Sequence, residues 1–384
     1  MYLQNKRIVI VSHEYATGPS HSLEDYLSSK VKNLLFIGHP FVFAHDTRSH
    51  YRLYTHGVTT PVRNRFISFS QNQIISIMKD IVLTVIWVLN NGKFDIYVGV
   101  DNVNTFVGIF LRKIGVVKKV VFYTIDYVPF RFTNKLLNRL YHNLDVYGVR
   151  HSNIVWNLSS SMVDGREKAG LEKAFRYKQI VVPVGTESNV KDVPRKKIKR
   201  FHVVHMGHLI KKQGIQLVIE AIPLIIKKIP EFHFDIIGGG DYEDYLKALA
   251  QKLGVSKYIT FYGYIQSHQE IERMLSYCAV GIAPYVDSPD SYVRYADPGK
   301  VKAYLAASLP IIITRVTPMA HEIERNRCGI SIPYDKKILV KAITTLLSDD
   351  KLLSEFRRNS KAMAKEYSWN KVFDRAMEIT LRAV

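Results

Sequence analysis

Residues 296–314 read ADPGKVKAYLAASLPIIIT, a pattern that predicts a helix followed at once by a short buried strand. Asp297 is a good N-cap and Pro298 suits the first helical position, so we expect the helix to begin here with Lys300 in its first turn. A lysine at this end opposes the helix dipole, which already places partial positive charge there. The segment therefore predicts an anion site, with a solvated lysine as the alternative.

The same alternation of strand and helix extends over almost all of the 384 residues. It predicts an α/β architecture with mainly parallel sheets. The predicted strands are Arg7–Ser12, Asn33–Gly38, Asp95–Val100, Lys119–Thr124, Asn153–Asn157 and Gln179–Val182 in a first series, and Phe201–Met206, Phe232–Ile237, Ile259–Tyr262, Val280–Ala283, Pro310–Thr314 and Ile330–Ile332 in a second. The predicted helices are Leu23–Ser29, Asn72–Leu89, Asn102–Ile114, Asn134–Leu144 and Ser160–Ala169, then Ile215–Lys228, Tyr242–Leu253, Gln269–Ser276, Pro298–Ala307, Pro318–Arg325, Ile338–Leu347, Lys351–Lys365 and Trp369–Leu381.

A lapse into proline, glycine and charge at residues 183–199 separates the two series, and the length of the chain favours two domains. We expect an N-terminal domain over residues 1–184, a basic linker over 185–200, a second domain over 201–366 and a last helix over 367–384. The two domains are expected to be Rossmann-like and to face a cleft, because ligands of such sheets bind beyond the carboxyl ends of the strands. The segment Phe41–Ser70, rich in Tyr, Arg and Thr, predicts a hairpin or an irregular insertion.

The formal charge of +20 indicates anionic partners, namely nucleic acid, an anionic membrane face or phosphorylated substrates. The sequence contains no zinc finger, RNP-type strand or recognition helix, so we expect no nucleic-acid partner and prefer a membrane surface. The densest basic cluster, residues 195–200, lies in the predicted linker, where a solvated linker is the simpler interpretation.

Cysteine usage and hydropathy bear on the setting of the protein. Cys278 and Cys328 are too few for a disulfide framework or a ligand cluster, so we expect no metal site and a reducing, cytoplasmic environment. No run reaches the roughly 18 apolar residues of a membrane span, and the first residues do not read as a signal peptide. The apolar stretch Asn72–Leu89 is expected to be buried inside the first domain, with a membrane-facing role as the alternative.

Glycine and lysine follow several predicted strands of the second series. Glycine lets a backbone approach a ligand closely, and two lysines can neutralise a diphosphate. Strand-to-helix turns also use glycine for steric reasons, and neither the dinucleotide-binding nor the P-loop spacing is present. The residues in question are Gly207, His208, Lys211, Lys212 and Gly214 after one strand, Gly238, Gly239 and Gly240 after the next, and Gly263 with Tyr264 after a third.

Taken together, these segments resemble the family 4 retaining glycosyltransferases of the GT-B fold. The resemblance is strongest over residues 203–332, and the ordered series of segments is more specific than any one of them. The first half of the chain matches mainly through Gly18 and the segment Tyr123–Tyr127, and the closing Tyr367-Ser368-Trp369 also looks like this family.

This resemblance implies a retaining, metal-independent transferase of hexosyl type. The sugar would move from a nucleotide donor held by residues 201–366 to an acceptor held mostly by residues 1–184, and the helix over 367–384 would cross back to the first domain. Without a metal, fixed cations and helix N-termini must stabilise the leaving diphosphate. The implied donor-binding residues are Gly18, Gly207, His208, Lys211, Gly239, Gly263, Tyr264, Asp297, Pro298 and Gly299, with Lys212 and Lys300 as catalytic cations at the diphosphate and with Gly263 and Tyr264 near the nucleobase.

The chain also departs from the family pattern. The family often has Arg and Lys where this chain has His208 and Gln213, so the charge would shift to Lys211 or Lys212. The two glutamates that usually lie eight residues apart fall at Tyr295 and Ala303, which makes the segment Asp-Pro-Gly-Lys a variant of that motif and puts the ribose and sugar contacts in doubt. The nearby candidates for those contacts are Asp287, Asp290, Arg294 and Asp297.

Asp126 is the expected catalytic carboxylate on the acceptor side, with Tyr127 and Arg131 beside it. A turn cap before Pro129 is the alternative interpretation. The family often has a histidine directly before this aspartate, where this chain has isoleucine, so His13 and His21 are alternative acid–base groups.

The sequence thus predicts a glycosyltransferase of surface or cell-envelope glycan (polysaccharide) synthesis. Its substrates would be a nucleotide sugar and a glycan or lipid-linked acceptor, with no further cofactor. We expect it in the cytoplasm, with peripheral attachment at the inner face of the membrane as an open possibility. The alternatives are a catalytically silent binding protein derived from such an enzyme and a sugar-nucleotide epimerase.

Overall fold

The computed structural model describes residues 3–14, 18–44, 46–59, 63–66, 72–186, 193–288 and 291–383. They form two compact units. Unit 1 consists of Met1–Pro183 together with Trp369–Val384, and unit 2 consists of Val184–Ser368. The last helix therefore belongs to the unit that contains the start of the chain.

The sheet of unit 1 has the strand order β4-β3-β2-β1-β6-β7-β8-β9. Its parallel strands are β1 (Arg7–Glu14), β2 (Asn33–Pro40), β6 (Phe94–Val100), β7 (Val117–Thr124), β8 (Ile154–Asn157) and β9 (Gln179–Val181). The chain moves outward from β1 to β2 and then returns to the other side of β1 with β6, so the direction of winding reverses between β1 and β6. Ligands of open α/β sheets bind at such a reversal.

The segment Phe41–Ser70 adds antiparallel strands to one edge of this sheet. They are β3 (Ser49–Thr55), β4 (Val58–Thr59) and β5 (Arg63–Phe66), with β4 and β5 both paired to β3. Within its described residues, the predicted hairpin is confirmed.

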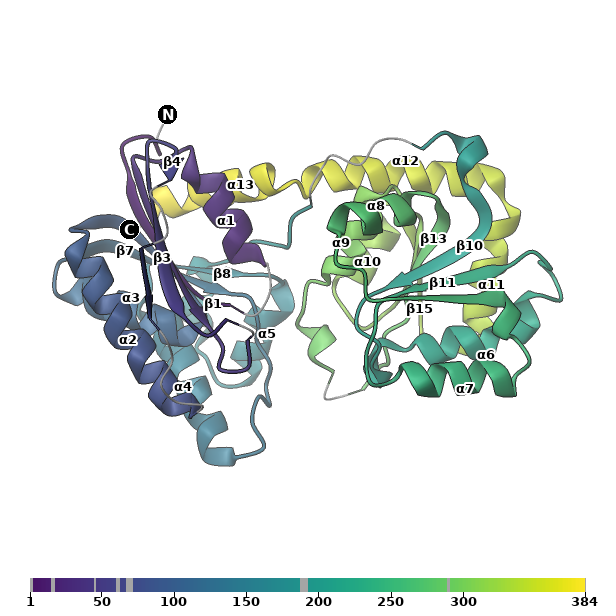
Figure 1. Cartoon of the computed structure of the whole chain (residues 1–384), viewed down its shortest axis with the longest axis horizontal. Helices are drawn as coiled ribbons and strands as arrows, with labels where there is room; N and C mark the ends of the chain where they lie inside the picture. Colours follow the sequence, from purple (N-terminus) through teal and green to yellow (C-terminus); the bar gives the residue numbers. More distant parts are fainter. Residues whose placement is uncertain are drawn as a thin grey trace. The chain divides into compact units, whose positions relative to one another are not determined.

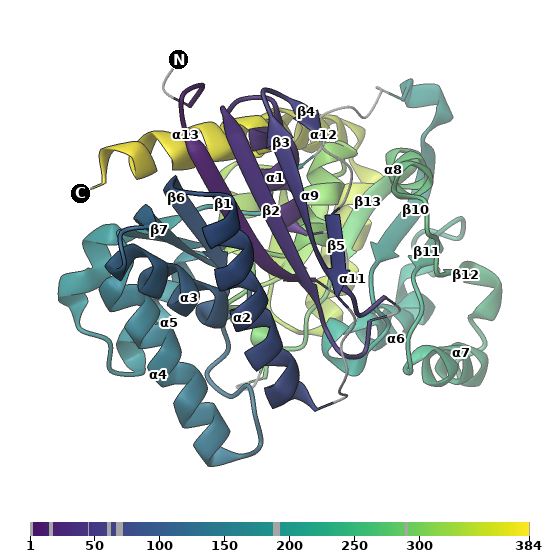
Figure 2. The same ribbon diagram turned by 60° about the vertical axis from the view of Figure 1, so that its left-hand side comes forward.

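Helices cover both faces of the unit 1 sheet. Helices α2, α3 and α4 lie side by side on one face, and α1 packs with α13 on the other, as both views show (Figures 1 and 2). The helices are α1 (Pro19–Ser28), α2 (Gln73–Asn90), α3 (Asn102–Lys113), α4 (Lys135–His151), α5 (Ser160–Lys168) and α13 (Trp369–Arg382). The ring of Tyr26 in α1 contacts that of Phe373 in α13 at a tilted angle, and Tyr26 donates a hydrogen bond to Asp374, which fixes the last helix on this unit.

Helix α4 is longer than the sequence predicted. Residues 145–151 contain glycine and β-branched residues, which are poor helix formers, yet they continue the helix to His151. Gly148 lies so close to Phe122 that a Cβ there would approach the ring to 3.0 Å, and Asp145 forms a buried ion pair with Arg166. Tertiary packing therefore overrides the local propensity.

The expectation that α2 is buried is wrong. The side chains at Ile74, Met78, Val82 and Ile86 all point to solvent. The helix contacts the sheet through a different face that includes Asp80, Thr84 and Trp87. Among the described residues, no helix combines the length and the apolarity that crossing a bilayer requires.

Unit 2 is a parallel sheet with the strand order β12-β11-β10-β13-β14-β15. The strands are β10 (Lys199–Met206), β11 (His233–Ile237), β12 (Ile259–Gly263), β13 (Cys278–Ala283), β14 (Ile311–Thr314) and β15 (Gly329–Ile332). In chain order this is 3-2-1-4-5-6, the doubly wound order of dinucleotide-binding sheets, and the winding reverses between β10 and β13.

Helices flank this sheet as well. They are α6 (Ile215–Ile225), α7 (Glu243–Lys252), α8 (His268–Ser276), α9 (Gly299–Ala306), α10 (Met319–Arg325), α11 (Lys336–Ser348) and α12 (Asp350–Glu366). The inner strands β13 and β14 are buried throughout, as strands covered by helices on both faces of a parallel sheet are.

The predicted basic linker is mostly exposed over residues 193–200, and it is continuous with unit 2. Residues 193–200 belong to unit 2, and the last two of them begin β10. Arg195 and Arg200 both pair with the carboxylate of Asp350, at 2.6 and 2.7 Å. Arg195 and Arg200 thus make exposed ion pairs with the first residue of α12.

Candidate functional site

Lys300 occupies the first turn of α9, as predicted, but the cap of this helix differs from the prediction. The N-cap is Pro298, and Asp297 does not cap the helix. The Asp297 carboxylate is buried, where it accepts a hydrogen bond from the backbone N–H of Val184 at 2.7 Å and pairs with Lys302 at 3.2 Å. The Asp297 carboxylate, which the sequence analysis predicted as the helix cap, therefore pairs with the buried side chain of Lys302 instead.

The Lys300 side chain has only neutral partners. Its Nζ donates a hydrogen bond to Oε1 of Gln213 at 2.6 Å and lies 3.2 Å from Nε2 of His205. The same nitrogen lies 5.4 Å from the ring centroid of Tyr285. Within the described part of the chain, no carboxylate pairs with Lys300. Burial lowers the pKa of Lys300 to about 7, and burial together with this neighbouring ammonium holds the pKa of His205 well below its ordinary value.

These contacts place Lys300 at the reversal of the unit 2 sheet. His205 lies on β10, and Tyr285 follows β13, the two strands between which the winding reverses. Gly207, directly after β10, has a φ of +127°, and a Cβ there would lie 3.0 Å from Lys300 Nζ. A side chain at this position would therefore displace the ammonium.

The other glycines of these turns fall into two groups. At Gly214, Gly238 and Gly240, φ is positive and a Cβ would lie within 2.5 Å of a backbone oxygen, so close packing of the chain on itself explains them. At Gly239 and Gly299 φ is not positive and no atom of the described chain lies closer than 3.8 Å to the Cβ position. The fold does not require glycine at these two positions.

The remaining predicted donor residues lie in the segment that follows β10 and at the end of β12. His208 and Lys211 are exposed, Lys212 is half-buried, and Gly263 adopts a positive φ ahead of the exposed Tyr264. The same short 3₁₀ turn, Lys211–Gln213, supplies Gln213 as the contact to Lys300.

Two of the candidate substitutes for the missing glutamates pair with each other. The Arg294 guanidinium donates a hydrogen bond to the carboxylate of Asp287. Asp290 lies outside the described residues. Ala303 packs against the apolar core of unit 2.

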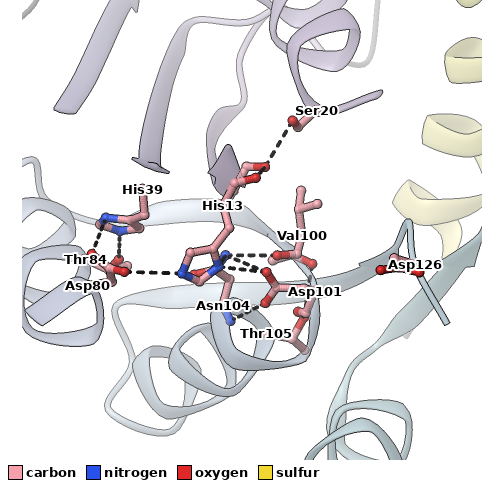
Figure 3. A network of polar contacts seen from close by, with 12 residues as sticks. His13, Ser20, His39, Asp80, Thr84, Val100, Asp101, Asn104, Thr105 and Asp126 are labelled. Atoms are coloured by element: carbon pink, nitrogen blue, oxygen red, sulfur yellow. Dashed lines mark hydrogen bonds and ion pairs between the residues drawn. The ribbon is translucent and has the colours of Figure 1, made fainter. Parts of the chain in front are cut away.

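In unit 1, a polar network lies at the reversal of the sheet between β1 and β6 (Figure 3). His13, near the end of β1, contacts Oδ2 of Asp101 through Nδ1 at 2.8 Å and Oδ2 of Asp80 through Nε2 at 3.3 Å. Asp80 of α2 also contacts His39 of β2 at 3.2 Å. No group of three or more His, Cys, Asp or Glu side chains suited to a metal ion occurs among the residues that the structure describes.

The two carboxylates beside His13 favour its protonated form. Burial by itself lowers its pKa, but the carboxylates of Asp101 and Asp80 outweigh burial and raise the pKa to about 10. The raised pKa suits a proton donor better than a proton acceptor at neutral pH, and an acid–base role of His13 stays a prediction. His21 is also engaged, because it contacts Glu14 at 2.9 Å and accepts a hydrogen bond from the backbone N–H of Gly18 at 3.3 Å. Gly18 itself is the N-cap of α1.

Asp101 was missed by the sequence analysis. Its φ of 78° and ψ of 173° fall in a region that only glycine normally adopts, at a cost of about 1–3 kcal/mol. Its carboxylate caps α3 through the N–H of Asn104 at 3.1 Å and holds His13. Backbone strain of this kind clusters at functional sites. The available signal was an aspartate between a predicted strand and a predicted helix.

Asp126 follows β7, the next strand along, and its carboxylate is exposed (Figure 3). Arg131 pairs with it at 2.5 Å, as the sequence predicted. Tyr127 is instead buried beneath the guanidinium of Arg166, 5.2 Å from its ring centroid, so it does not line the same surface.

The His13 network predicts a pH dependence of stability. Because the pKa of His13 is raised above 6.5 in the folded state, its contribution to stability is complete below pH 6.5 and is lost as the pH rises towards 10. The difference in unfolding free energy between the wild type and His13→Asn should therefore shrink over this range, by at most about 1.4 kcal/mol per pH unit. Calorimetric unfolding of the full chain at several pH values measures it, and a difference that stays constant from pH 6 to 10 would contradict the assignment.

Comparisons with known proteins come from sequence and from structure. Residues 187–363 match the model of the family described as glycosyl transferases group 1. The chain is 21% identical over 256 residues to an uncharacterized glycosyltransferase of Haemophilus influenzae, covering 65% of this chain and 66% of the relative. It is 22% identical over 187 residues to a protein of Escherichia coli K12 named as the colanic acid biosynthesis glycosyltransferase WcaL, covering 48% of this chain and 45% of the relative. The matches thus span less than two thirds of each relative.

The fold is that of a solved GT-B structure. HepE of Anabaena, solved in complex with UDP, superposes with a TM-score of 0.73 at 15% identity, covering 98% of this chain and 100% of that chain. The predicted fold class is confirmed. The chain therefore has the GT-B fold, its residues 187–363 match the glycosyl transferases group 1 family, and these findings support a role in glycosyl transfer.

Proposed function

We propose that the protein is a metal-independent, retaining hexosyltransferase of the family 4 type, in which the segment Asp297–Lys300 replaces the usual pair of glutamates. It transfers a sugar from a nucleotide sugar to a glycan or lipid-linked acceptor in the synthesis of a surface or cell-envelope polysaccharide. The observation that carries the proposal is Lys300, an ammonium with only neutral partners at the reversal of the unit 2 sheet.

An ammonium in this position suits a diphosphate. Taking a cation out of water without an anionic partner costs several kcal/mol, so a fold retains it only where it is used. The leaving diphosphate of a nucleotide sugar gains charge in the transition state, and a fixed ammonium at a helix N-terminus stabilises that charge. Gly299, beside Lys300, and Gly239 are positions where the fold itself does not require glycine, which fits a close approach of the ligand.

The other donor residues extend this site in the proposal. The backbone of Gly207 and Pro298 and the side chains of His208, Lys211 and Lys212 flank the phosphates, and Gly263 with Tyr264 contacts the nucleobase. Gly18 stays a predicted donor-binding residue. Asp297 acts through Lys302 rather than on the ligand. The choice of a nucleotide sugar is supported by the family match and by the UDP in the HepE structure, and the choice of a polysaccharide by the name of WcaL.

On the acceptor side, Asp126 is the proposed catalytic carboxylate, held by Arg131. It orients or deprotonates the acceptor hydroxyl. The strained Asp101, at the end of the neighbouring strand, is a second carboxylate at the same edge and positions His13.

Replacing Asp126 by Asn distinguishes catalysis on the acceptor side from binding of the nucleotide. General acid–base groups contribute about 10²–10⁴-fold to turnover, so Asp126→Asn should lower kcat by that factor while the Kd for the nucleotide stays within about twofold. Steady-state kinetics with calorimetric titration of the nucleotide measures both. Asp164→Asn, an exposed aspartate paired with Arg176, is the matched control and should change neither. Unchanged kcat in Asp126→Asn would leave Asp126 as a turn cap.

A ligand screen tests the proposed function as a whole. The full chain is melted with UDP, GDP, ADP and CMP sugars, and release of nucleotide is followed in the presence of EDTA and of Mg²⁺. At a ligand concentration of about 100 times Kd, binding stabilises by about 2.7 kcal/mol. We expect a shift with one base and slow donor hydrolysis that EDTA leaves unchanged. A shift without hydrolysis would favour the silent binding protein, loss of hydrolysis in EDTA would remove metal independence, and no shift with any base would overturn the proposal.

A further inference from the structure

Helix α2 exposes an apolar face. Ile74, Met78, Val82 and Ile86 follow one another at intervals of four residues and are 63%, 62%, 55% and 45% exposed. Within residues 74–89 every exposed side chain of the helix is apolar. The exposed side of a surface helix is normally polar, so this stripe marks an interaction surface.

The helices beside α2 continue this surface. On α3, Phe106 and Phe110 are exposed one turn apart, and Ile114 follows at the next turn. The segment 130–140, which leads into α4, exposes further apolar side chains, among them Phe130 and Leu136. Figure 2 shows α2, α3 and α4 next to one another in front of the sheet. We call the exposed side chains of α2, α3 and residues 130–140 the apolar–basic face.

The charge of this face has one sign. Helices α2, α3 and α4 contain two acidic residues, Asp80 and Asp145, and these are 3% and 2% exposed. The exposed cations are Lys113 at the end of α3 and Lys135 and Arg139 in α4. The exposed apolar side chains of α3 and α4 thus have cations on the same helices, and none of the three helices exposes a carboxylate.

We infer that the apolar–basic face binds the surface of an anionic lipid bilayer, with the apolar side chains of α2, α3 and residues 130–140 entering the interface and the cations contacting lipid headgroups. Amphipathic helices with apolar residues on one side and Lys or Arg beside them bind in this way. A second copy of the chain is a poorer fit, because pairing two such faces would bring cations together without any carboxylate to neutralise them.

The inference does not depend on the donor site, since bilayer binding requires no nucleotide. It does bear on the acceptor. Arg131, within the face, pairs with Asp126, so the proposed acceptor carboxylate lies at its border. A lipid-linked acceptor held in the same bilayer would reach that carboxylate from the membrane side.

Vesicle flotation of the full chain tests the inference. Vesicles of phosphatidylcholine alone are compared with vesicles of an equimolar mixture with phosphatidylglycerol, at low and high salt. The apolar variant is Met78→Gln/Val82→Gln/Ile86→Gln, and the charge variant is Lys135→Gln/Arg139→Gln. The wild type should float with the anionic vesicles, less at high salt and less with the neutral ones. The charge variant should bind about 30-fold more weakly, which corresponds to two cations at about 1 kcal/mol each.

Matched controls exchange the same kinds of residue elsewhere. Tyr177→Gln/Ile338→Gln/Ile379→Gln removes three exposed apolar side chains, and Lys336→Gln/Lys337→Gln removes two exposed lysines of α11. The controls should float like the wild type, and circular dichroism should show the wild-type Tm for every variant. The inference is overturned if the wild type never floats, if the apolar and charge variants float like the controls, or if gel filtration shows a dimer that the apolar variant dissociates.

Discussion

Replacing Lys300 by Met should weaken binding of the nucleoside diphosphate by about 10- to 100-fold, the loss that corresponds to one hydrogen bond to a charged group. The ammonium has no anionic partner of its own in the described chain, so its favourable electrostatic contact would come from the ligand. Methionine has a similar length and keeps the packing against Tyr285 while removing the charge. Calorimetric titration of the full chain measures the change.

The same substitution should make the unliganded protein more stable. Because burial lowers the pKa of Lys300 to about 7, the ammonium costs stability at pH values below 7, and this cost disappears as the pH rises towards the ordinary value of a lysine. At pH 6 we therefore expect Lys300→Met to raise Tm, by ~2–4 °C for each 1 kcal/mol recovered in a domain of this size. The gain should vanish near pH 10.

Substitutions of two other lysines show whether the effects of Lys300→Met are specific to that position. Lys247, exposed and paired with Glu243, is the matched control, and Lys247→Met should change neither binding nor Tm by a measurable amount. Lys302→Met should lower Tm instead, because it leaves the buried Asp297 carboxylate without its cation. If Lys300→Met lowered Tm at pH 6 as Lys302→Met does, Lys300 would be a structural residue and not a ligand-binding one.

Replacing Asp80 by Asn should lower the unfolding free energy of unit 1 by about 3–5 kcal/mol, the loss typical of breaking a buried ion pair from one side. Its carboxylate contacts His13, His39 and Lys79, and these contacts hold its pKa well below the ordinary value. Asparagine leaves the buried His13 cation with Asp101 as its remaining carboxylate partner among these contacts. Denaturant unfolding of the full chain measures the loss.

A double variant distinguishes charge from packing. If the loss arises because the His13 cation keeps only one of its two carboxylate partners, His13→Asn combined with Asp80→Asn should recover part of the stability that Asp80→Asn loses. Asp46→Asn, at an exposed pair with Arg48, is the control and should cost no more than about 0.5 kcal/mol. A double variant that is less stable than Asp80→Asn by the full cost of His13→Asn would show that the two side chains act independently.

The strands of both units could be predicted because their sequences carry continuous apolar runs. In unit 2 each observed strand agrees with its predicted bounds to within two residues. Long-range packing could not be read in this way. Residues 145–151 became helical through contacts of Gly148 and Asp145 with distant elements, although their local propensity is low.

The apolarity of α2 was visible in the sequence, but the direction of its apolar side chains was not. Ile, Val and Leu surround almost the whole helix, so periodicity cannot tell which side faces the sheet. The structure shows that the side with Asp80 and Thr84 is buried and that an entirely apolar side is exposed. The polar side chains of α2 that face the sheet can be buried because they form hydrogen bonds there, as Thr84 does with His39.

The candidate site was predicted in part. Lys300 was found because a lysine at a helix N-terminus is unusual in itself. His205, which contacts it, lay within a predicted strand, and Asp101 lay between a predicted strand and a predicted helix, so the sequence singled out neither. Their roles depend on which strands are neighbours, β10 with β13 and β1 with β6, and strand order is not written in local sequence.

Proton uptake on binding is the measurement that tests the central claim most directly. A diphosphate that contacts Lys300 should raise its pKa from about 7, so binding of a nucleoside diphosphate about one pH unit above that value should take up a proton. Titration calorimetry in buffers of different ionisation enthalpy measures this uptake. The account predicts uptake of nearly one proton by the wild type and none by Lys300→Met; binding without uptake, or equal uptake by both proteins, would contradict it.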